Sequence, residues 1–359
     1  MKSTKFVVTG LGAIGKRHAH MILGTPGAHL VALIEPDPAK LEGFNQLQEL
    51  PIFSSIEEFF DSGIDVDVVN ICTPNGLHAS LAIKALKQGA HVVIEKPMGL
   101  SRKECEEVIF TSLQMSKQVF VVKQNRYSPP SRWLKEIVSE KIIGDVLMAQ
   151  VNCYWNRDDR YYKPGDWKGT LALDGGTLFT QFSHFIDIMY WVFGDVRNIR
   201  ANFANYTHRH NTEFEDSGVV QFDFVNGGMG CINFSTAVWD TNMESSITVV
   251  GTKGSAKIGG QYMNEIEYCH IDAYEKPVLP PTNPPNDYGP FKGSAANHHH
   301  VIENVINTLN GTDTITANAL EGMKVVEIIE RIYEFRNLEK LNLEKGTLLE
   351  IPDASGVMI

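Results

Sequence analysis

Short apolar runs alternate with amphipathic segments along the first third of the chain. An apolar run at 5–9 leads through a helical segment at 16–23 into a second apolar run at 29–34. The alternation continues and predicts the other elements of this region, with helices at 56–60, 77–87 and 101–116 and strands at 66–71, 91–94 and 119–122. Apolar strands that alternate with amphipathic helices are typical of a doubly wound parallel sheet.

The pattern changes at about residue 146. Segments that alternate in polarity or carry β-branched residues predict strands at 146–154, 199–204, 217–224, 230–235, 246–250 and 255–258. Asn226-Gly227-Gly228 fits a hairpin turn between two of them. Helices are expected before and after these strands, at 177–193, 301–309 and 320–335. The second part of the chain is therefore predicted to be an α+β domain with one open-faced, mainly antiparallel sheet.

A glycine motif stands between the first strand and the first helix. Gly10 permits a tight turn, Gly12 lets the backbone approach a pyrophosphate, and Gly15 lets the helix pack on the strand. Ala13 and Ile14 open the helix, whose N-terminus offers free N–H groups to phosphates. Within a strand–turn–helix–strand unit, this spacing predicts a Rossmann dinucleotide-binding domain. We place this domain at 1–123 and the α+β domain at 124–359.

Glu35 stands at the end of the second strand, twenty residues after Gly15. A carboxylate at this position binds both hydroxyls of the adenine ribose and repels a 2′-phosphate, so NAD is expected rather than NADP. Further polar clusters follow later strands, where ligands of doubly wound sheets bind. The predicted cofactor-binding residues are Gly10, Gly12, Ala13, Ile14, Gly15, Glu35, Thr73, Asn75, His78, Glu95, Lys96 and Asn125.

Composition excludes several classes of function. The net charge of −11 argues against nucleic acid as a partner, and no apolar stretch is long enough to cross a membrane. The N-terminus lacks the apolar core of a signal peptide. The five cysteines are scattered without a CxxC pair, which indicates reduced thiols in a cytoplasmic protein.

Several motifs together resemble the Gfo/Idh/MocA family of oxidoreductases over essentially the whole chain. They are the glycine motif, Thr73-Pro-Asn-Gly-Leu-His78, Glu95-Lys-Pro97, the segment from Asp174 to His184, and Ala319–Glu327. The resemblance implies a Rossmann domain followed by a domain with an open-faced sheet, NAD as cofactor, and Lys96 as the catalytic base. It also implies a cis Lys96–Pro97 bond.

Other segments resemble one branch of this family, the WlbA/WbpB type, which oxidises the C3 hydroxyl of UDP-N-acetylglucosaminuronic acid with NAD. They are Gln124–Tyr127, Tyr154–Tyr162, Trp167–Thr170 and Thr180–His184. The resemblance implies a role in bacterial surface polysaccharide (lipopolysaccharide O-antigen) biosynthesis. Oxidation of another sugar or an inositol, a non-catalytic NAD-binding regulator, and a lyase or hydrolase that uses NAD transiently remain alternatives.

Lys96 and His184 are the predicted catalytic residues. A lysine buried near a cationic nicotinamide loses part of its proton affinity and can serve as a base near neutral pH. A lone histidine on an apolar helix is more often a core residue, but His184 matches a position that contacts substrate in the family. Many family members carry Asp four residues before this histidine, where this chain has Thr180. Thr180 and Gln181 are therefore expected to hydrogen-bond the substrate, and Asp187 either orients His184 or has no such role.

Basic and aromatic residues gather between 154 and 168. Guanidinium groups bind carboxylate or pyrophosphate in a bidentate manner, and aromatic rings stack on sugar or uracil. Asp158, Asp159 and Asp166 partly cancel this charge, so a solvated, self-paired loop is the alternative. The predicted substrate-binding residues are Lys96, Arg126, Tyr127, Arg157, Tyr161, Tyr162, Trp167, Thr180, Gln181 and His184.

Two further expectations concern metals and assembly. His298, His299 and His300 point in different directions on a helix, so no metal site is expected. A sheet with helices on one face leaves its other face to be covered by a partner, so we expect a homodimer or homotetramer through that face.

Overall fold

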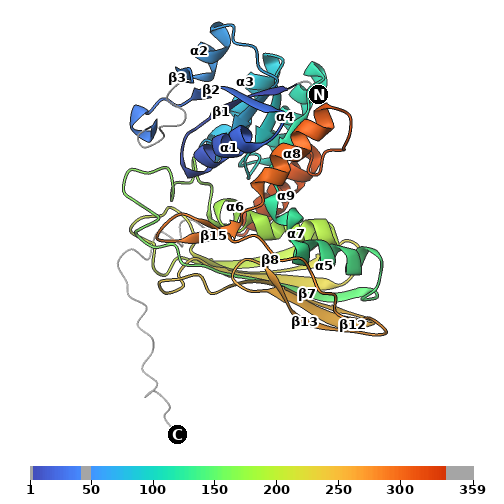
Figure 1. The fold of residues 1–359 in the computed structure, drawn as a ribbon. Helices are drawn as coiled ribbons and strands as arrows, with labels where there is room; N and C mark the ends of the chain where they lie inside the picture. Colours follow the sequence, from blue (N-terminus) through green and yellow to red (C-terminus); the bar gives the residue numbers. More distant parts are fainter. Residues whose placement is uncertain (1–2, 42–49, 337–359) are drawn as a thin grey trace.

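The computed structural model describes residues 3–41 and 50–336 and contains two large sheets, one above the other in Figure 1, and a small two-stranded one. The first sheet has the strand order β3-β2-β1-β4-β5-β6, and every pair is parallel. Its strands are β1 (Thr4–Thr9), β2 (Ala28–Ile34), β3 (Ile52–Phe53), β4 (Val68–Ile71), β5 (His91–Ile94) and β6 (Val119–Val121). This order is the one typical of dinucleotide-binding Rossmann domains, so the predicted doubly wound sheet is confirmed.

Helices flank this sheet: α1 (Ala13–Gly24), α2 (Ile56–Asp61), α3 (His78–Lys87) and α4 (Arg102–Met115), with short 3-10 turns η1 (Pro38–Leu41) and η3 (Asn75–Leu77). Local sequence explains where two of them begin. Ser55 accepts a hydrogen bond from the backbone of Glu58, and Ser101 forms a capping box with Glu104. Such caps satisfy backbone N–H groups that a helix leaves unpaired at its start.

The second sheet has seven strands in the order β13-β12-β11-β7-β10-β9-β8. They are β7 (Val146–Tyr154), β8 (Val196–Ala204), β9 (Ser217–Phe224), β10 (Met229–Ser235), β11 (Glu244–Gly251), β12 (Gly254–Gly259) and β13 (Glu265–Ile271). Every pair is antiparallel except β7 with β10, which is parallel. The prediction of a mainly antiparallel sheet is therefore confirmed.

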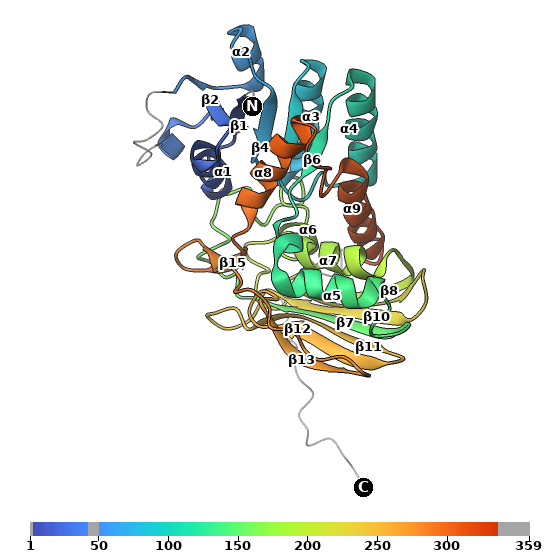
Figure 2. The ribbon, with the colours of Figure 1, turned by 45° about the vertical axis from the view of Figure 1, so that its right-hand side comes forward.

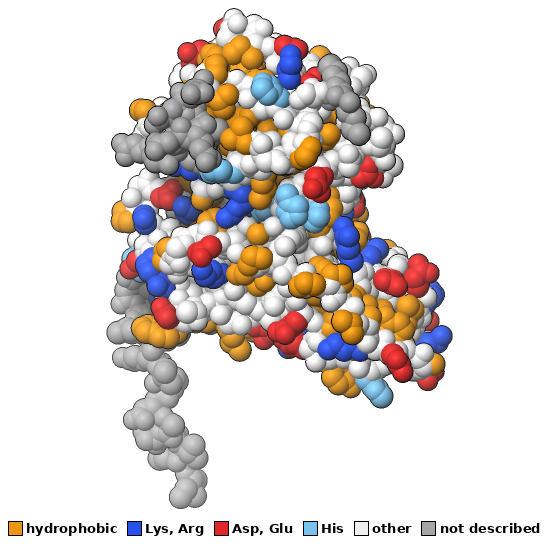
Figure 3. Space-filling model, in the orientation of Figure 1, with side chains coloured by type: hydrophobic (Ala, Val, Ile, Leu, Met, Phe, Trp, Pro, Cys, Tyr) orange, Lys and Arg blue, Asp and Glu red, His pale blue; other side chains and the backbone are white. Residues whose placement is uncertain are grey.

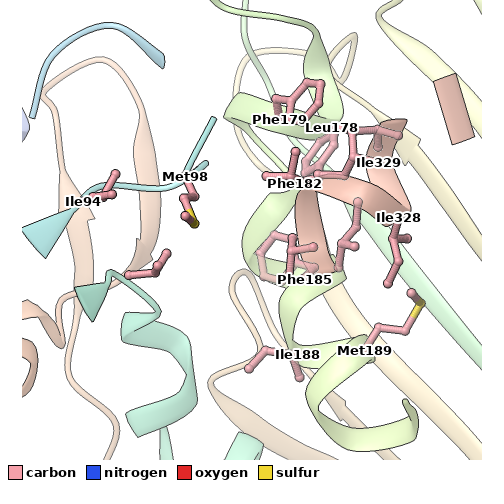
Figure 4. Close-up of a cluster of buried hydrophobic side chains, with 14 of the residues drawn as sticks. Ile94, Met98, Leu178, Phe179, Phe182, Phe185, Ile188, Met189, Ile328 and Ile329 are labelled. Carbon is pink, nitrogen blue, oxygen red and sulfur yellow. The ribbon is translucent and has the colours of Figure 1, made fainter. Parts of the chain in front are cut away.

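Helices cover one face of this sheet and leave the other open (Figure 1). The covering elements are α5 (Pro129–Ser139), α6 (Thr177–Thr180) and α7 (Ser183–Phe193), and the turn η4 (Gln124–Tyr127) precedes them. In the buried core, Phe182 and Phe185 lie against Ile328 and Ile329 (Figure 4). A small hairpin, β14 (Pro285–Asp287) with β15 (Lys292–Ala295), completes the domain.

Two helices near the end of the chain, α8 (His298–Leu309) and α9 (Ala319–Tyr333), return to the first domain. Figure 2 shows α8 beside α1 and α9 beside α4. Gly322 of α9 sits so close to β6 that a Cβ there would come within 2.7 Å of Val121. The outer ends of the two predicted domain ranges, 1–2 and 337–359, lie outside the described residues.

The structure corrects the predicted helix at 177–193, which is broken at Gln181 and Phe182 into α6 and α7. The break leaves the carbonyl oxygen of Thr180 free to accept a hydrogen bond of 2.7 Å from Lys96 Nζ. Helix α5, strand β13 and the β14–β15 hairpin were not predicted. Among the described residues, no helix is long and apolar enough to cross a membrane.

Candidate active site

A cavity of about 480 Å³ lies between the two domains. Basic side chains and histidines lie along the waist of the molecule in Figure 3. Both domains contribute to the cavity wall, and most of the predicted site residues meet there. Those that line it are Gly10, Gly12, Ala13, Ile14, Glu35, Thr73, Asn75, His78, Glu95, Lys96, Arg157, Tyr161, Trp167, Thr180, Gln181 and His184.

The glycine motif has the geometry of a phosphate-binding turn. Gly10 has a φ of +83°, and a Cβ there would lie 2.8 Å from the carbonyl oxygen of Cys72. A Cβ on Gly15 would lie 1.8 Å from the carbonyl oxygen of Gly10. A Cβ on Gly12 would meet nothing within 4 Å, and no side chain caps the first turn of α1. Gly12 and the start of α1 thus present bare backbone to the cavity, which fits a dinucleotide pyrophosphate.

Glu35 directly follows β2 at the rim of this turn, with its side chain 1% exposed. Its Oε2 accepts a hydrogen bond of 2.6 Å from the backbone of Leu11, and its Oε1 accepts one of 3.0 Å from that of Asp37. These bonds hold the carboxylate at the cavity, where it suits ribose hydroxyls and disfavours a 2′-phosphate. The residues present therefore fit NAD.

Lys96 reaches across the domain junction from the end of β5. The Lys96–Pro97 bond is cis, as the resemblance implies. Nζ donates a 2.7 Å hydrogen bond to the carbonyl oxygen of Thr180. Burial lowers the pKa of Lys96 to about 8, although Glu95 acts in the opposite direction. The neutral amine that a proton acceptor needs is therefore accessible at mildly alkaline pH.

His184 lies on α7 and lines the same cavity. Its Nε2 is 3.5 Å from Nε2 of Gln124, and its Nδ1 has no hydrogen-bond partner among the described residues. Burial, and then the positive charge of Lys96, hold the pKa of His184 well below its usual range. The ring is thus neutral and available to a ligand. Asp187 does not orient it, because that carboxylate pairs with Lys123 and Arg126 instead.

Thr180 and Gln181 line the cavity, but their polar groups already have protein partners. The Thr180 hydroxyl is hydrogen-bonded to the Asp174 carboxyl and accepts a 2.7 Å bond from Asn75 Nδ2. The side-chain amide of Gln181 accepts from Arg157 at 2.8 Å and donates to the Tyr161 hydroxyl at 2.7 Å.

Arg157 is a buried cation in the cavity wall, with a side chain 2% exposed. In the described part of the chain, each hydrogen bond of its guanidinium goes to a neutral oxygen, on Gln181, Asn156, Asn242 or Lys292. Burial lowers the pKa of Arg157, yet a guanidinium keeps its charge at any ordinary pH. The cavity therefore holds a positive charge that lacks a paired carboxylate.

Glu95 is the centre of a second buried cluster at the cavity. Its Oε1 lies 2.9 Å from His18 Nε2 and 3.6 Å from His298 Nε2. Burial alone would raise the pKa of Glu95, but His18, His298 and Lys96 hold it at about 2. The ligand atoms of the two histidines and Glu95 lie within 4.8 Å of one another, so the expected absence of a metal stays a prediction.

Five predicted site residues do not line the cavity: Gly15, Asn125, Arg126, Tyr127 and Tyr162. Arg126 is the main correction. Its guanidinium is buried in a bidentate pair with Asp187, at 2.8 and 2.9 Å, and contacts Glu321 at 2.7 Å. These carboxylates already neutralise its charge. Tyr127 stacks on His300, and Tyr162 packs on His208 and Phe214, so both are packing residues here.

Several cavity residues were not predicted. Arg17 donates to the Tyr288 hydroxyl at 3.2 Å, and Phe291 packs against Tyr161. Tyr288 and Phe291 lie in or beside the β14–β15 hairpin, whose sequence shows no clear strand pattern. Arg17 could have been found, because it stands two residues after the glycine motif on α1.

Comparisons with known proteins agree with this geometry. A family model described as an oxidoreductase family with an NAD-binding Rossmann fold (GFO_IDH_MocA) matches residues 4–123, and the GFO/IDH/MocA C-terminal domain matches 131–257.

Two similar solved structures are WlbA dehydrogenases from Bordetella pertussis and Chromobacterium violaceum, each in complex with NADH and UDP-GlcNAcA. Both are 29% identical with a TM-score of 0.83, over 93% of this chain and 96% and 94% of theirs. An inositol 2-dehydrogenase/D-chiro-inositol 3-dehydrogenase from Lactiplantibacillus plantarum is 26% identical over 70% of each chain. The chain therefore belongs to the Gfo/Idh/MocA family and is an NAD-dependent oxidoreductase that acts on a CH–OH group.

Proposed function

We propose that this enzyme oxidises the C3 hydroxyl of UDP-N-acetylglucosaminuronic acid to a ketone, in bacterial surface polysaccharide (lipopolysaccharide) biosynthesis. The observation that carries the proposal is Arg157, a buried guanidinium without a carboxylate partner in the described chain, in the same cavity as Lys96. A buried charge is costly unless it is paired. An anionic substrate supplies that partner.

The uronic acid fits this position better than a neutral sugar does. Its C6 carboxylate can take the place of a protein carboxylate at Arg157 in a charge-assisted, bidentate contact. Lys168 also lines the cavity, but its charge is already paired with Asp166 at 2.8 Å, so Arg157 carries the argument for an anionic substrate. The two WlbA structures with bound UDP-GlcNAcA support the same substrate class.

In the proposed reaction, Lys96 accepts the proton of the C3 hydroxyl, and NAD held by the glycine turn and Glu35 would supply the hydride acceptor. Lys96 must be neutral to do so, and burial lowers its pKa to about 8. His184, also neutral, binds the reacting hydroxyl through a ring nitrogen and keeps it in place. Gln181 and Tyr161 hold Arg157 toward the sugar, and Trp167 offers a ring for stacking.

The remaining parts of the proposal concern architecture and place. We place the NAD-binding domain at 1–123 and the substrate and assembly domain at 124–359. We propose that the open sheet face forms the interface of a homodimer or homotetramer. A cytoplasmic location fits free cysteines and a soluble nucleotide-sugar substrate.

The test is the near-ultraviolet absorbance of NADH after purified enzyme is mixed with NAD and UDP-N-acetylglucosaminuronic acid. We expect NADH to form, either continuously or as a single burst, and Lys96→Ala to abolish it. Addition of 2-oxoglutarate shows whether bound NADH is reoxidised in place, because the burst then disappears. Lack of signal with this sugar, together with turnover of another sugar, would refute the substrate.

A second candidate, oxidation of an inositol or a neutral sugar, is favoured by the similarity to the inositol dehydrogenase. The two candidate substrate classes differ in charge, because the uronic acid carries a carboxylate and the inositol or neutral sugar does not. The same assay with myo-inositol and UDP-N-acetylglucosamine therefore separates them. A regulator would give no NADH with any substrate, and an enzyme that uses NAD transiently would form product without accumulating NADH.

A further inference from the structure

Asp174 is a buried carboxyl group directly behind the cavity wall, just before α6, and the proposed reaction does not use it. Its Oδ2 accepts a 2.9 Å hydrogen bond from the backbone of Gly169, and its Oδ1 is hydrogen-bonded to the Thr180 hydroxyl. Burial raises the pKa of Asp174 to about 7 in spite of these bonds. Asp174 is therefore expected to change charge near neutral pH.

Thr180 joins Asp174 to the proposed base. Its side-chain oxygen contacts the Asp174 carboxyl, while its backbone carbonyl accepts the 2.7 Å hydrogen bond from Lys96 Nζ. Asn75 donates to the same Thr180 hydroxyl at 2.7 Å and to the backbone carbonyl of Asp174 at 2.9 Å. The hydroxyl therefore has an acceptor in ionised Asp174 and a donor in Asn75. Thr180 thus connects the Asp174 carboxyl group to Lys96, and the orientation of Thr180 depends on its contacts with both residues.

We propose that Asp174 is a positioning residue that sets the proton affinity of Lys96 through its charge and through Thr180. This inference rests on the role proposed for Lys96 as the base. The substrate hydroxyl would give its proton to the Lys96 amine, with NAD as the hydride acceptor, while Asp174 itself would neither gain nor lose a proton. Its carboxylate favours the ammonium that forms and holds the Thr180 carbonyl against it.

Other charged groups also act on this pair. Lys96 is influenced by Glu95, Lys123 and Arg157 besides Asp174, and its charge in turn affects His78, His184 and His298. Asp174 is influenced by Lys96 and Lys168, and its charge affects Tyr161 and Tyr162. Glu95 is already bonded to His18. Asp174 differs from Glu95 because its hydrogen-bonded partner, Thr180, also holds the Lys96 ammonium.

The test measures the titration of Lys96 without any sugar. The rate at which acetic anhydride modifies Lys96 in the apoenzyme is followed across a pH series by peptide mass spectrometry. Asp174→Asn removes the negative charge, so we expect the midpoint for Lys96 to fall by roughly one pH unit. Thr180→Val removes the hydroxyl that stabilises ionised Asp174 but keeps the backbone carbonyl that binds Lys96. It should therefore also lower the Lys96 midpoint, by less than Asp174→Asn does.

Glu215→Gln is the matched control, because Glu215 is a second buried carboxyl, which accepts hydrogen bonds from the backbone of Thr177 and from Tyr333 and Arg336. It should leave the Lys96 midpoint unchanged even if it lowers stability. If Asp174→Asn does not fold, Thr180→Val still decides the question. A wild-type midpoint in every folded variant of the two would overturn the inference. Because the Lys96 midpoint is measured without substrate, its result tests the role of Asp174 independently of the proposed UDP-sugar substrate.

Discussion

The role of each basic residue at the domain junction depends on its partner. Arg126 and Arg157 are both buried, yet Arg126 is paired with Asp187 and Glu321 and Arg157 only with neutral oxygens. A paired guanidinium has little attraction left for a ligand. An unpaired one gains most from an anion that enters the cavity. Residue type alone therefore does not identify the substrate contact.

The buried environment of Lys96 predicts a pH profile for oxidation. Its pKa is lowered to about 8, and only the neutral amine can accept the substrate proton. The rate should therefore be constant above about pH 8 and fall tenfold per unit below it, as the ammonium becomes dominant. Initial rates across pH check this. NAD binding, followed by protein fluorescence, should stay level over the same range and serves as the control.

Arg157→Gln should weaken the binding of the uronic acid selectively. Loss of a charge-assisted contact costs about 1.5–3 kcal/mol, so KM for UDP-N-acetylglucosaminuronic acid should rise by roughly ten- to hundredfold. Any slow turnover of UDP-N-acetylglucosamine should change little. Arg160→Gln is the matched control, because Arg160 is exposed and paired with Asp158. Equal losses for both variants would contradict the proposed contact.

The sequence predicted those site residues whose function depends on residues close to them in the sequence. The glycine motif and Glu35 lie within one strand–helix–strand unit, and Lys96 directly follows a strand. The partner of Arg126 lies on α7, 61 residues away, so its neutralisation could not be read from the local pattern. In the sequence, Asp174 stands out only as the first residue of a family motif, because its proposed role depends on its contact with Thr180 and on its burial.

At the scale of elements, a tertiary hydrogen bond accompanies a helix break that the hydrophobic periodicity did not predict. Residues 177–193 are mainly apolar, so their pattern predicts one helix. Lys96 instead takes the carbonyl of Thr180, and the chain divides into α6 and α7 at that point. The break therefore belongs to the active site. The other strands of the first sheet and its helices were predicted within a few residues, because each is a short, regular unit, but the two-residue strand β3 was not predicted.

The glycine turn predicts a contrast between two neighbouring substitutions. Gly15→Ala places a Cβ against the Gly10 carbonyl and should lower the thermal unfolding midpoint by roughly 5 °C or more. Gly12→Ala meets no protein atom, so it should leave that midpoint nearly unchanged and weaken NAD binding. Thermal unfolding and NAD titration, run on both variants, check this. A stable Gly15→Ala enzyme would refute the close helix–strand packing.

At the scale of the whole molecule, the doubly wound parallel sheet was predicted from the regular alternation of strands and helices. The parallel pairing of β7 with β10 did not, because it joins strands that are far apart in the sequence. The outer face of this sheet exposes apolar side chains in adjacent strands. They include Met148, Val219, Met229, Val250 and Tyr268.

If this face is the subunit interface, charges placed there should separate the subunits. Val219 and Met229 are 47% and 57% exposed on adjacent strands. The double variant Val219→Lys, Met229→Lys should shift the sedimentation coefficient from a dimer or tetramer to a monomer with the fold intact. Leu113→Lys is the control, because Leu113 is 72% exposed on α4 and far from the sheet face. A wild-type enzyme that sediments as a monomer would refute the interface.

The return of α8 to the first domain limits how this enzyme can be dissected. His298, at the start of α8, reaches Glu95 at the end of β5, and Val301, Ile302 and Val305 pack in the same core as α1. A fragment that ends at residue 123 would leave that core uncovered and the dinucleotide cavity without one wall. The NAD-binding domain is therefore not expected to fold as a separate fragment. Anyone who grafts it onto another substrate domain must transplant the distant C-terminal helices as well.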